Sequence, residues 1–268
     1  MKKRVARFVL LAFLVALAGC SGENGDLATE DGGHTQDSGQ DGTSGDADAD
    51  SGTDCLDGSF IILNDPDVDV LKPYTCITGD LSITAEGLTN VDLPNLTWIG
   101  GSLYIGGNAA LTSLDLSALT SVGGSLSVVS NPALTSLDGL SAITSLGGSL
   151  YINVTDLTSL GLSALTSVGG YLHVQDNPDL TSLGLSALTS VGEDLLILNT
   201  ALTSLGLSAL TSVGGSYLTI AGNYALPTCE ACDLLDQLWG LGFYGTFNFS
   251  GNKPDTCPDD CNYYSGGT

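Results

Sequence analysis

The sequence predicts an all-β protein, a parallel β-solenoid of about nine coils with a short helix at its C-terminal end. Three observations predict this fold. A repeat of 22–24 residues runs from about residue 60 to residue 252, and its apolar pieces are two to four residues long, with Gly, Asn or Ser between them. Six cysteines flank the regular repeats. Short apolar pieces separated by turn residues indicate short strands, and a fixed period of this length indicates stacked repeats.

Residues 1–19 have the composition of a signal peptide: a basic start precedes the apolar run Phe8–Ala18, which is too short to span a membrane. The run ends in Leu17-Ala18-Gly19-Cys20, which resembles the lipobox of bacterial lipoproteins. The resemblance implies that Cys20 becomes the mature N-terminus and carries lipid, and that Ser21 directs the protein to the outer membrane. We therefore expect a lipid anchor in the outer membrane, facing the cell surface; the alternative is an ordinary secretory signal.

Residues 20–54 are expected to form a disordered acidic tether. Residues 21–54 contain ten acids, no Lys or Arg and one sizeable apolar residue, Leu27, so this segment cannot bury enough surface to fold. After loss of the signal peptide, two lysines (Lys72 and Lys253) stand against thirty acids, which gives a net charge of −28. A protein of this charge has no basic footprint for nucleic acid, so we expect no nucleic-acid partner.

Residues 55–226 are expected to form the solenoid repeats. Alternation within Leu103-Tyr104-Ile105 places the leucine and isoleucine inside and the tyrosine outside. Weaker copies of the same strand occur around Phe60 and Phe247, which brings the total to nine. The regular copies of this strand begin at Leu81, Leu103, Leu126, Leu150, Leu172, Leu195 and Leu218.

Asparagines predict a second ladder along the solenoid. An Asn side chain at a buried turn can bond backbone groups of the adjacent coil. Ala85 and Val154 interrupt the series, in coils whose turn is one residue shorter. The expected members, each three residues before the next inward leucine, are Asn108, Asn131, Asn177, Asn199 and Asn223.

The repeat "LTSLxLSALTSVGGSLxIxxN" resembles the receptor L-domain-like repeats of secreted and cell-wall proteins, and Leu103-x-Ile105-x-x-Asn108 resembles the core of the leucine-rich repeat. The resemblance covers most of residues 60–252. It implies a right-handed solenoid with few or no regular helices in its coils. It implies little about the ligand, because such modules serve recognition, adhesion and wall architecture alike.

Residues 227–268 are expected to form a disulfide-stapled C-terminal cap. Leu234, Leu235, Leu238 and Trp239 have helical spacing and indicate a short amphipathic helix within residues 229–241. In an exported protein six flanking cysteines indicate three disulfides, whereas a zinc site is the alternative for the last four. The cysteines are Cys55 and Cys76, which form the natural first pair, and Cys229, Cys232, Cys257 and Cys261, for which we favour Cys229–Cys257 with Cys232–Cys261.

The outward slot of the repeated strand predicts the candidate binding face. Tyr104, Tyr151 and His173 share this slot, and aromatic side chains on a flat sheet can stack on sugar rings or anchor a protein partner. The alternative interpretation is that these residues simply suit exposed strand positions. We expect a monomer that binds the membrane through its lipid and recognises a glycan or a surface protein through this face.

Enzymatic activity is not expected, and neither is a cofactor or a metal. His173 is the only histidine after the tether, and the sequence has no nucleophile elbow, phosphate loop or HExxH motif. The predicted function is therefore non-catalytic recognition or adhesion, with a structural envelope spacer as the alternative. A carbohydrate-active β-helix enzyme and an ice-binding protein, the latter suggested by the repeated Thr-Ser pairs, are weaker hypotheses.

Overall fold

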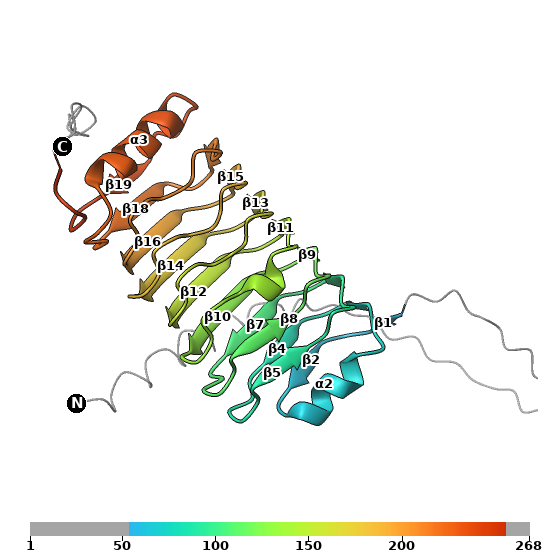
Figure 1. Cartoon of the computed structure of the whole chain (residues 1–268). Helices are drawn as coiled ribbons and strands as arrows, with labels where there is room; N and C mark the ends of the chain where they lie inside the picture. Colours follow the sequence, from blue (N-terminus) through green and yellow to red (C-terminus); the bar gives the residue numbers. More distant parts are fainter. Residues whose placement is uncertain (1–53, 256–268) are drawn as a thin grey trace, which may run out of the picture. The chain divides into compact units, whose positions relative to one another are not determined.

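The computed structural model describes residues 54–255, and this part of the chain is a parallel β-solenoid with two α-helices (Figure 1). The predicted fold class is therefore confirmed. The predicted signal peptide, Cys20, nearly all of the tether, Cys257 and Cys261 lie outside the described residues.

Two parallel sheets run along the solenoid, and each of the first eight coils contributes a strand to each. The long sheet consists, in spatial order, of β2 (Phe60–Ile62), β4 (Leu81–Ile83), β7 (Leu103–Gly106), β10 (Leu126–Asn131), β12 (Leu150–Thr155), β14 (Leu172–Asn177), β16 (Leu195–Thr200), β18 (Tyr217–Ala221) and β19 (Thr246–Asn248). The short-strand sheet consists of β1 (Cys55–Leu56), β3 (Cys76–Ile77), β6 (Trp98–Ile99), β9 (Ser121–Val122), β11 (Ser145–Leu146), β13 (Ser167–Val168), β15 (Ser190–Val191) and β17 (Ser212–Val213).

The remaining elements are few. A two-stranded parallel sheet is formed by β5 (Asn90–Asp92) and β8 (Ser113–Asp115), and a 3₁₀ turn, η1, spans Asp138–Leu140. The α-helices are α2 (Asp65–Leu71) and α3 (Thr228–Trp239).

The number of turns is slightly below the nine expected, although all nine predicted strands are present in the long sheet. The outermost strands, β2 and β19, belong to end coils in which a helix replaces part of the coil, and about seven regular turns lie between them. The inward side chains of these turns form one continuous core. In β7, for example, both Leu103 and Ile105 are fully buried, as the alternation predicts.

The buried asparagine ladder is confirmed for four of its five predicted members: Asn108, Asn131, Asn177 and Asn223 are fully buried. Each side-chain oxygen accepts a hydrogen bond from a backbone N–H of the preceding coil, as Asn131 does from Asn108 at 3.2 Å. The amide nitrogen of Asn131 donates to the Ile105 carbonyl at 2.9 Å. These bonds satisfy buried backbone groups that water cannot reach.

The prediction that Asn199 belongs to this ladder is wrong, because Thr200 occupies the ladder position. Thr200 is 5% exposed and donates from Oγ1 to Asn223 Oδ1 at 2.7 Å, whereas Asn199 is exposed. Thr155 makes the same contact with Asn177. Both coils are shortened after the ladder position, so the inward leucine follows it by two residues instead of three.

A threonine ladder, formed by the threonine that precedes each strand of the short-strand sheet from β3 to β17, joins the coils along this sheet. Thr120 Oγ1 donates to the Thr97 carbonyl at 3.1 Å, and Thr144 Oγ1 donates to the Thr120 carbonyl at 3.1 Å. The repeated Thr-Ser pair therefore has a structural role. Its donors and acceptors run through Thr75, Thr97, Thr120, Thr144, Thr166, Thr189 and Thr211.

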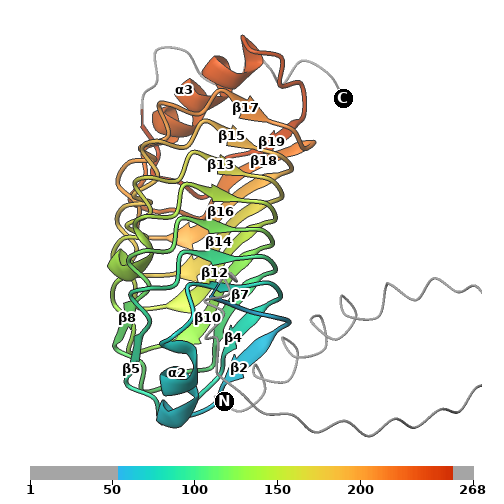
Figure 2. The ribbon, with the colours of Figure 1, turned by 90° about the vertical axis from the view of Figure 1, so that its right-hand side faces the viewer.

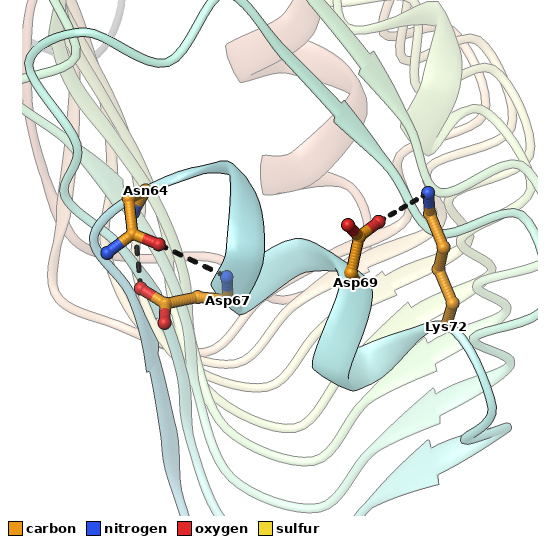
Figure 3. Close-up of polar contacts among 4 residues, drawn as sticks. All are labelled: Asn64, Asp67, Asp69 and Lys72. Carbon is orange, nitrogen blue, oxygen red and sulfur yellow. Dashed lines mark hydrogen bonds and ion pairs between the residues drawn. The ribbon is translucent and has the colours of Figure 1, made fainter.

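Helix α2 in the first coil was not predicted, and its N-terminus is fixed by a capping box (Figure 3). Asn64 Oδ1 accepts from the Asp67 N–H at 3.3 Å, and Asp67 Oδ2 accepts from the Asn64 N–H at 3.2 Å. Pro66 lies in the first turn, where proline is well tolerated. At the other end, Lys72 Nζ lies 2.7 Å from Asp69 Oδ1.

The predicted C-terminal cap helix is confirmed as α3, which lies across the end of the solenoid (Figure 2). Leu234, Leu235 and Leu238 are buried against the last coil. Glu230 Oε2 accepts from the Leu205 N–H at 3.2 Å, and Gln237 Nε2 donates to the Leu210 carbonyl. The helix therefore covers the apolar core and satisfies backbone groups that the last coil would otherwise leave open.

Candidate functional site

The outward column of the long sheet has the predicted register in every coil. Tyr104 pairs with Ser127, Ser127 with Tyr151, and Tyr151 with His173 on neighbouring strands. We call these four residues the strip; Ser127 is buried and the other three are half-buried. The full column reads Ile61, Ser82, Tyr104, Ser127, Tyr151, His173, Leu196, Thr219 and Asn248.

The structure brings two of the three predicted site residues into direct contact. The rings of Tyr151 and His173 lie 4.9 Å apart, centroid to centroid, at an interplanar angle of 88°. This edge-to-face arrangement is the favoured geometry for aromatic pairs. Tyr104 lies two strands away from Tyr151, with Ser127 between them.

Tyr104 lies along its own strand, above Gly106. A Cβ atom placed on Gly106 would lie 2.2 Å from both Cζ and the hydroxyl oxygen of Tyr104. The far end of the ring therefore occupies the space that any other side chain at residue 106 would fill.

A chain of polar side chains extends from His173 to the carboxyl edge of the long sheet. His173 Nε2 lies 2.8 Å from Gln175 Oε1, Gln175 Nε2 donates to Asp176 Oδ2 at 2.8 Å, and Asn199 Nδ2 donates to Asp176 Oδ1 at 2.9 Å. Because the Asp176 carboxylate accepts from the Gln175 amide nitrogen, the amide oxygen faces His173. Nε2 of His173 is thus the donor in the hydrogen bond to Gln175 Oε1.

Gln175, Asp176 and Asn199 were not predicted as site residues, although the sequence holds one signal for them. In several coils the residue before the ladder position has a positive φ; it is glycine at Gly107 and Gly222, but Ser130 (φ 56°), Asp176 (φ 54°) and Asn199 (φ 53°) elsewhere. Asp and Asn tolerate this region better than most residues but still at a cost. Strain of this kind often marks functional positions.

Both tyrosines of the strip remain protonated at neutral pH. Burial raises the pKa of Tyr104, and burial together with the negative charge of Asp176 raises the pKa of Tyr151. The strip therefore offers two neutral phenols with hydroxyl donors.

A second irregular group lies at the opposite, amino-terminal edge of the long sheet. Tyr171 replaces a serine of the corner sequence, and its hydroxyl bonds the carboxylate of Glu193, which raises the pKa of Tyr171. Glu193 in turn stands where neighbouring coils have Gly170 and Gly215. The two departures from the repeat compensate each other, so this group has a local structural explanation.

The predicted disulfide Cys55–Cys76 is confirmed and joins neighbouring coils at the N-terminal end. Cys229 and Cys232 are also disulfide-bonded cysteines. Their expected partners Cys257 and Cys261 lie outside the described residues, so this pairing stays a prediction. Among residues 54–255 no three His, Cys, Asp or Glu side chains are grouped so as to hold a metal ion.

The fold and the strip define the class: a parallel β-solenoid whose irregular outward residues gather on its long sheet. A scan against protein-family models, a search of curated proteins and a search of solved structures each find no match to this chain. In the part of the chain that the structure describes, neither helix has the length and apolar character needed to cross a membrane.

Proposed function

We propose that this chain is a lipid-anchored, non-catalytic recognition or adhesion protein of the bacterial outer membrane, and that the strip is its binding face. The observation that carries the proposal is the contrast between columns. The threonine and asparagine ladders repeat one chemistry from coil to coil, because they hold the coils together. The outward column has no such constraint, and yet it places two tyrosines and a histidine on three of four adjacent strands.

The anchoring part of the proposal rests on the sequence. The lipobox-like Leu17-Ala18-Gly19-Cys20 supplies the lipid site, and the acidic residues that follow supply a tether to the solenoid. Repeats resembling receptor L domains accord with a display role. The Asp176 carboxylate near the strip already accepts hydrogen bonds from Gln175 and Asn199. This arrangement favours a binding role over a catalytic one.

Substituting Cys20→Ala is expected to abolish lipid attachment and to release the protein from the membrane fraction. The measurement is incorporation of radiolabelled palmitate in cells, followed by separation of membrane and soluble fractions. Ser21→Ala is the matched control and should keep both the label and the membrane location. Labelling that persists in Cys20→Ala would contradict the proposed anchor.

Substituting Tyr151→Ala is expected to weaken ligand binding by about tenfold or more, as is typical of an aromatic anchor at the centre of an interface. The full chain in detergent micelles is tested against immobilised glycans and surface proteins. Tyr224→Ala is the matched control, because Tyr224 is 79% exposed and lies outside the strip. Equal binding by both variants would show that the strip is not the binding face.

A further inference from the structure

The two tyrosines of the strip are arranged as a pair of platforms in one line. Tyr104 on β7 and Tyr151 on β12 occupy the same column, with β10 between them. Adjacent strands lie about 4.8 Å apart, so equivalent positions on β7 and β12 are about 10 Å apart along the solenoid axis. This separation is close to the length of a disaccharide unit in an extended polysaccharide.

Between the platforms lies a buried hydroxyl group that has no partner among the described residues. Ser127 is 6% exposed, and its Oγ makes no hydrogen bond within residues 54–255. An unpaired buried hydroxyl is destabilising, and native structures rarely leave one without a reason. A ligand hydroxyl seated between Tyr104 and Tyr151 would provide the missing partner.

The charges around the strip point to an uncharged ligand. The mature chain has a net charge of −28. Its two lysines lie away from the strip: Lys72 forms an ion pair with Asp69 beside α2, and the backbone of Lys253 forms a β-bridge with Pro227 in the cap. An acidic polymer would therefore meet repulsion without a compensating cation. Both oxygens of Asp176, the carboxylate next to the strip, accept hydrogen bonds from neutral amide groups, so the strip offers a ligand hydrogen-bonding groups and no cation.

We propose that the strip binds an uncharged, extended polysaccharide that runs along the solenoid axis, across the strands of the long sheet. One sugar ring stacks on the outward face of Tyr104 and another on Tyr151. A hydroxyl of the intervening unit bonds Ser127, and further sugar hydroxyls reach the polar chain His173–Gln175–Asp176. This inference rests on the proposed function, because it names the ligand of the same face.

Substituting Gly106 tests the Tyr104 platform without replacing any residue that is proposed to contact the ligand. A methyl group at residue 106 would displace the Tyr104 ring, while the backbone of Gly106 has no positive φ to forbid alanine. Gly106→Ala is therefore expected to weaken binding about tenfold, as Tyr104→Ala does. The double variant should lose no more than Tyr104→Ala alone, because both changes remove one platform.

Ser127→Ala separates the ligand contact from folding. Loss of an unpartnered hydroxyl should leave the thermal unfolding midpoint unchanged or raise it, whereas binding should weaken about two- to tenfold. A purely structural serine would show the reverse pattern, with reduced stability and unchanged binding.

The experiment is affinity electrophoresis and calorimetry of the full chain in detergent micelles with three probes: hydroxyethylcellulose as the uncharged polymer, alginate as the acidic one and poly-L-lysine as the cationic one. Binding of hydroxyethylcellulose alone, weakened in Tyr104→Ala, Gly106→Ala and Ser127→Ala but not in Tyr224→Ala, is the expected result. Failure to bind hydroxyethylcellulose would overturn the inference. Binding of poly-L-lysine that depends on the strip would overturn the sugar assignment while leaving a recognition face. If no strip variant altered hydroxyethylcellulose binding, both this inference and the strip as the recognition face would be overturned.

Discussion

Replacing Asn131 with alanine is expected to lower the free energy of unfolding by about 3 kcal/mol. Asn131 is fully buried, and its side chain makes four hydrogen bonds: it accepts from the Asn108 N–H and the Asn108 amide, and it donates to the carbonyls of Ile105 and Val129. Alanine would leave the Asn108 N–H without its acceptor and would remove a hydrogen bond from the Ile105 carbonyl, at a turn that water cannot reach, and such losses are costly.

The measurement is urea denaturation followed by circular dichroism, with the Cys20→Ala background used to remove the lipid. Asn199→Gly is the matched control, because Asn199 was assigned to the same ladder by sequence but lies exposed with φ at 53°. Glycine suits that conformation, so the control should keep or slightly raise stability. Similar losses in the two variants would mean that the ladder does not hold the coils together.

The contrast between Asn131 and Asn199 shows how far the repeat alone determines this fold. Strand positions follow from alternation of side chains, so Leu103, Tyr104 and Ile105 lie where the sequence predicts them. The ladder position in a turn is inferred from its distance along the sequence to the next strand. This distance is ambiguous when the coil is one residue shorter. In the coil of Asn199 the missing residue lies after the ladder position, and Thr200 with its hydroxyl takes over the hydrogen bond.

Helix α2 was missed for a related reason. The repeat predicts only a weaker copy of the strand around Phe60 here, whereas the sequence Asp65-Pro66-Asp67 makes Asn64 the N-cap of a helix. The local capping signal is stronger here than the repeat, because the first coil has no preceding coil against which a ladder asparagine could bond. Repeat patterns are therefore least informative at the ends of a solenoid.

The candidate site was predicted only in part, because its second half depends on contacts between coils. Alternation places Tyr104, Tyr151 and His173 in one column, which needs only the repeat length. The bond from Asn199 to Asp176 joins residues 23 positions apart in the turns, and the orientation of Gln175 follows from it. The packing of Tyr104 over Gly106 likewise depends on a side-chain rotamer that sequence does not specify.

Replacing Gly147 with alanine is expected to destabilise the solenoid by about 3 kcal/mol. Glycines at this corner are needed for the close approach of neighbouring coils, and not for an unusual backbone conformation. A Cβ atom on Gly147 would lie 2.1 Å from the carbonyl oxygen of Gly123 in the preceding coil, and that oxygen belongs to a rigid backbone. The coils would have to separate, which would weaken the bond from the Gly147 N–H to the Val122 carbonyl, now 3.0 Å long.

The same measurement distinguishes this steric effect from a general effect of adding alanine. Gly87→Ala is the matched control, because nothing lies within 4 Å of a Cβ atom there and its φ is not positive. Alanine at residue 87 should raise stability slightly, since it restricts the unfolded chain. A loss in both variants would contradict the argument. A loss only at residue 147 would show that the corner glycines are needed because the coils pack too closely there for any side chain.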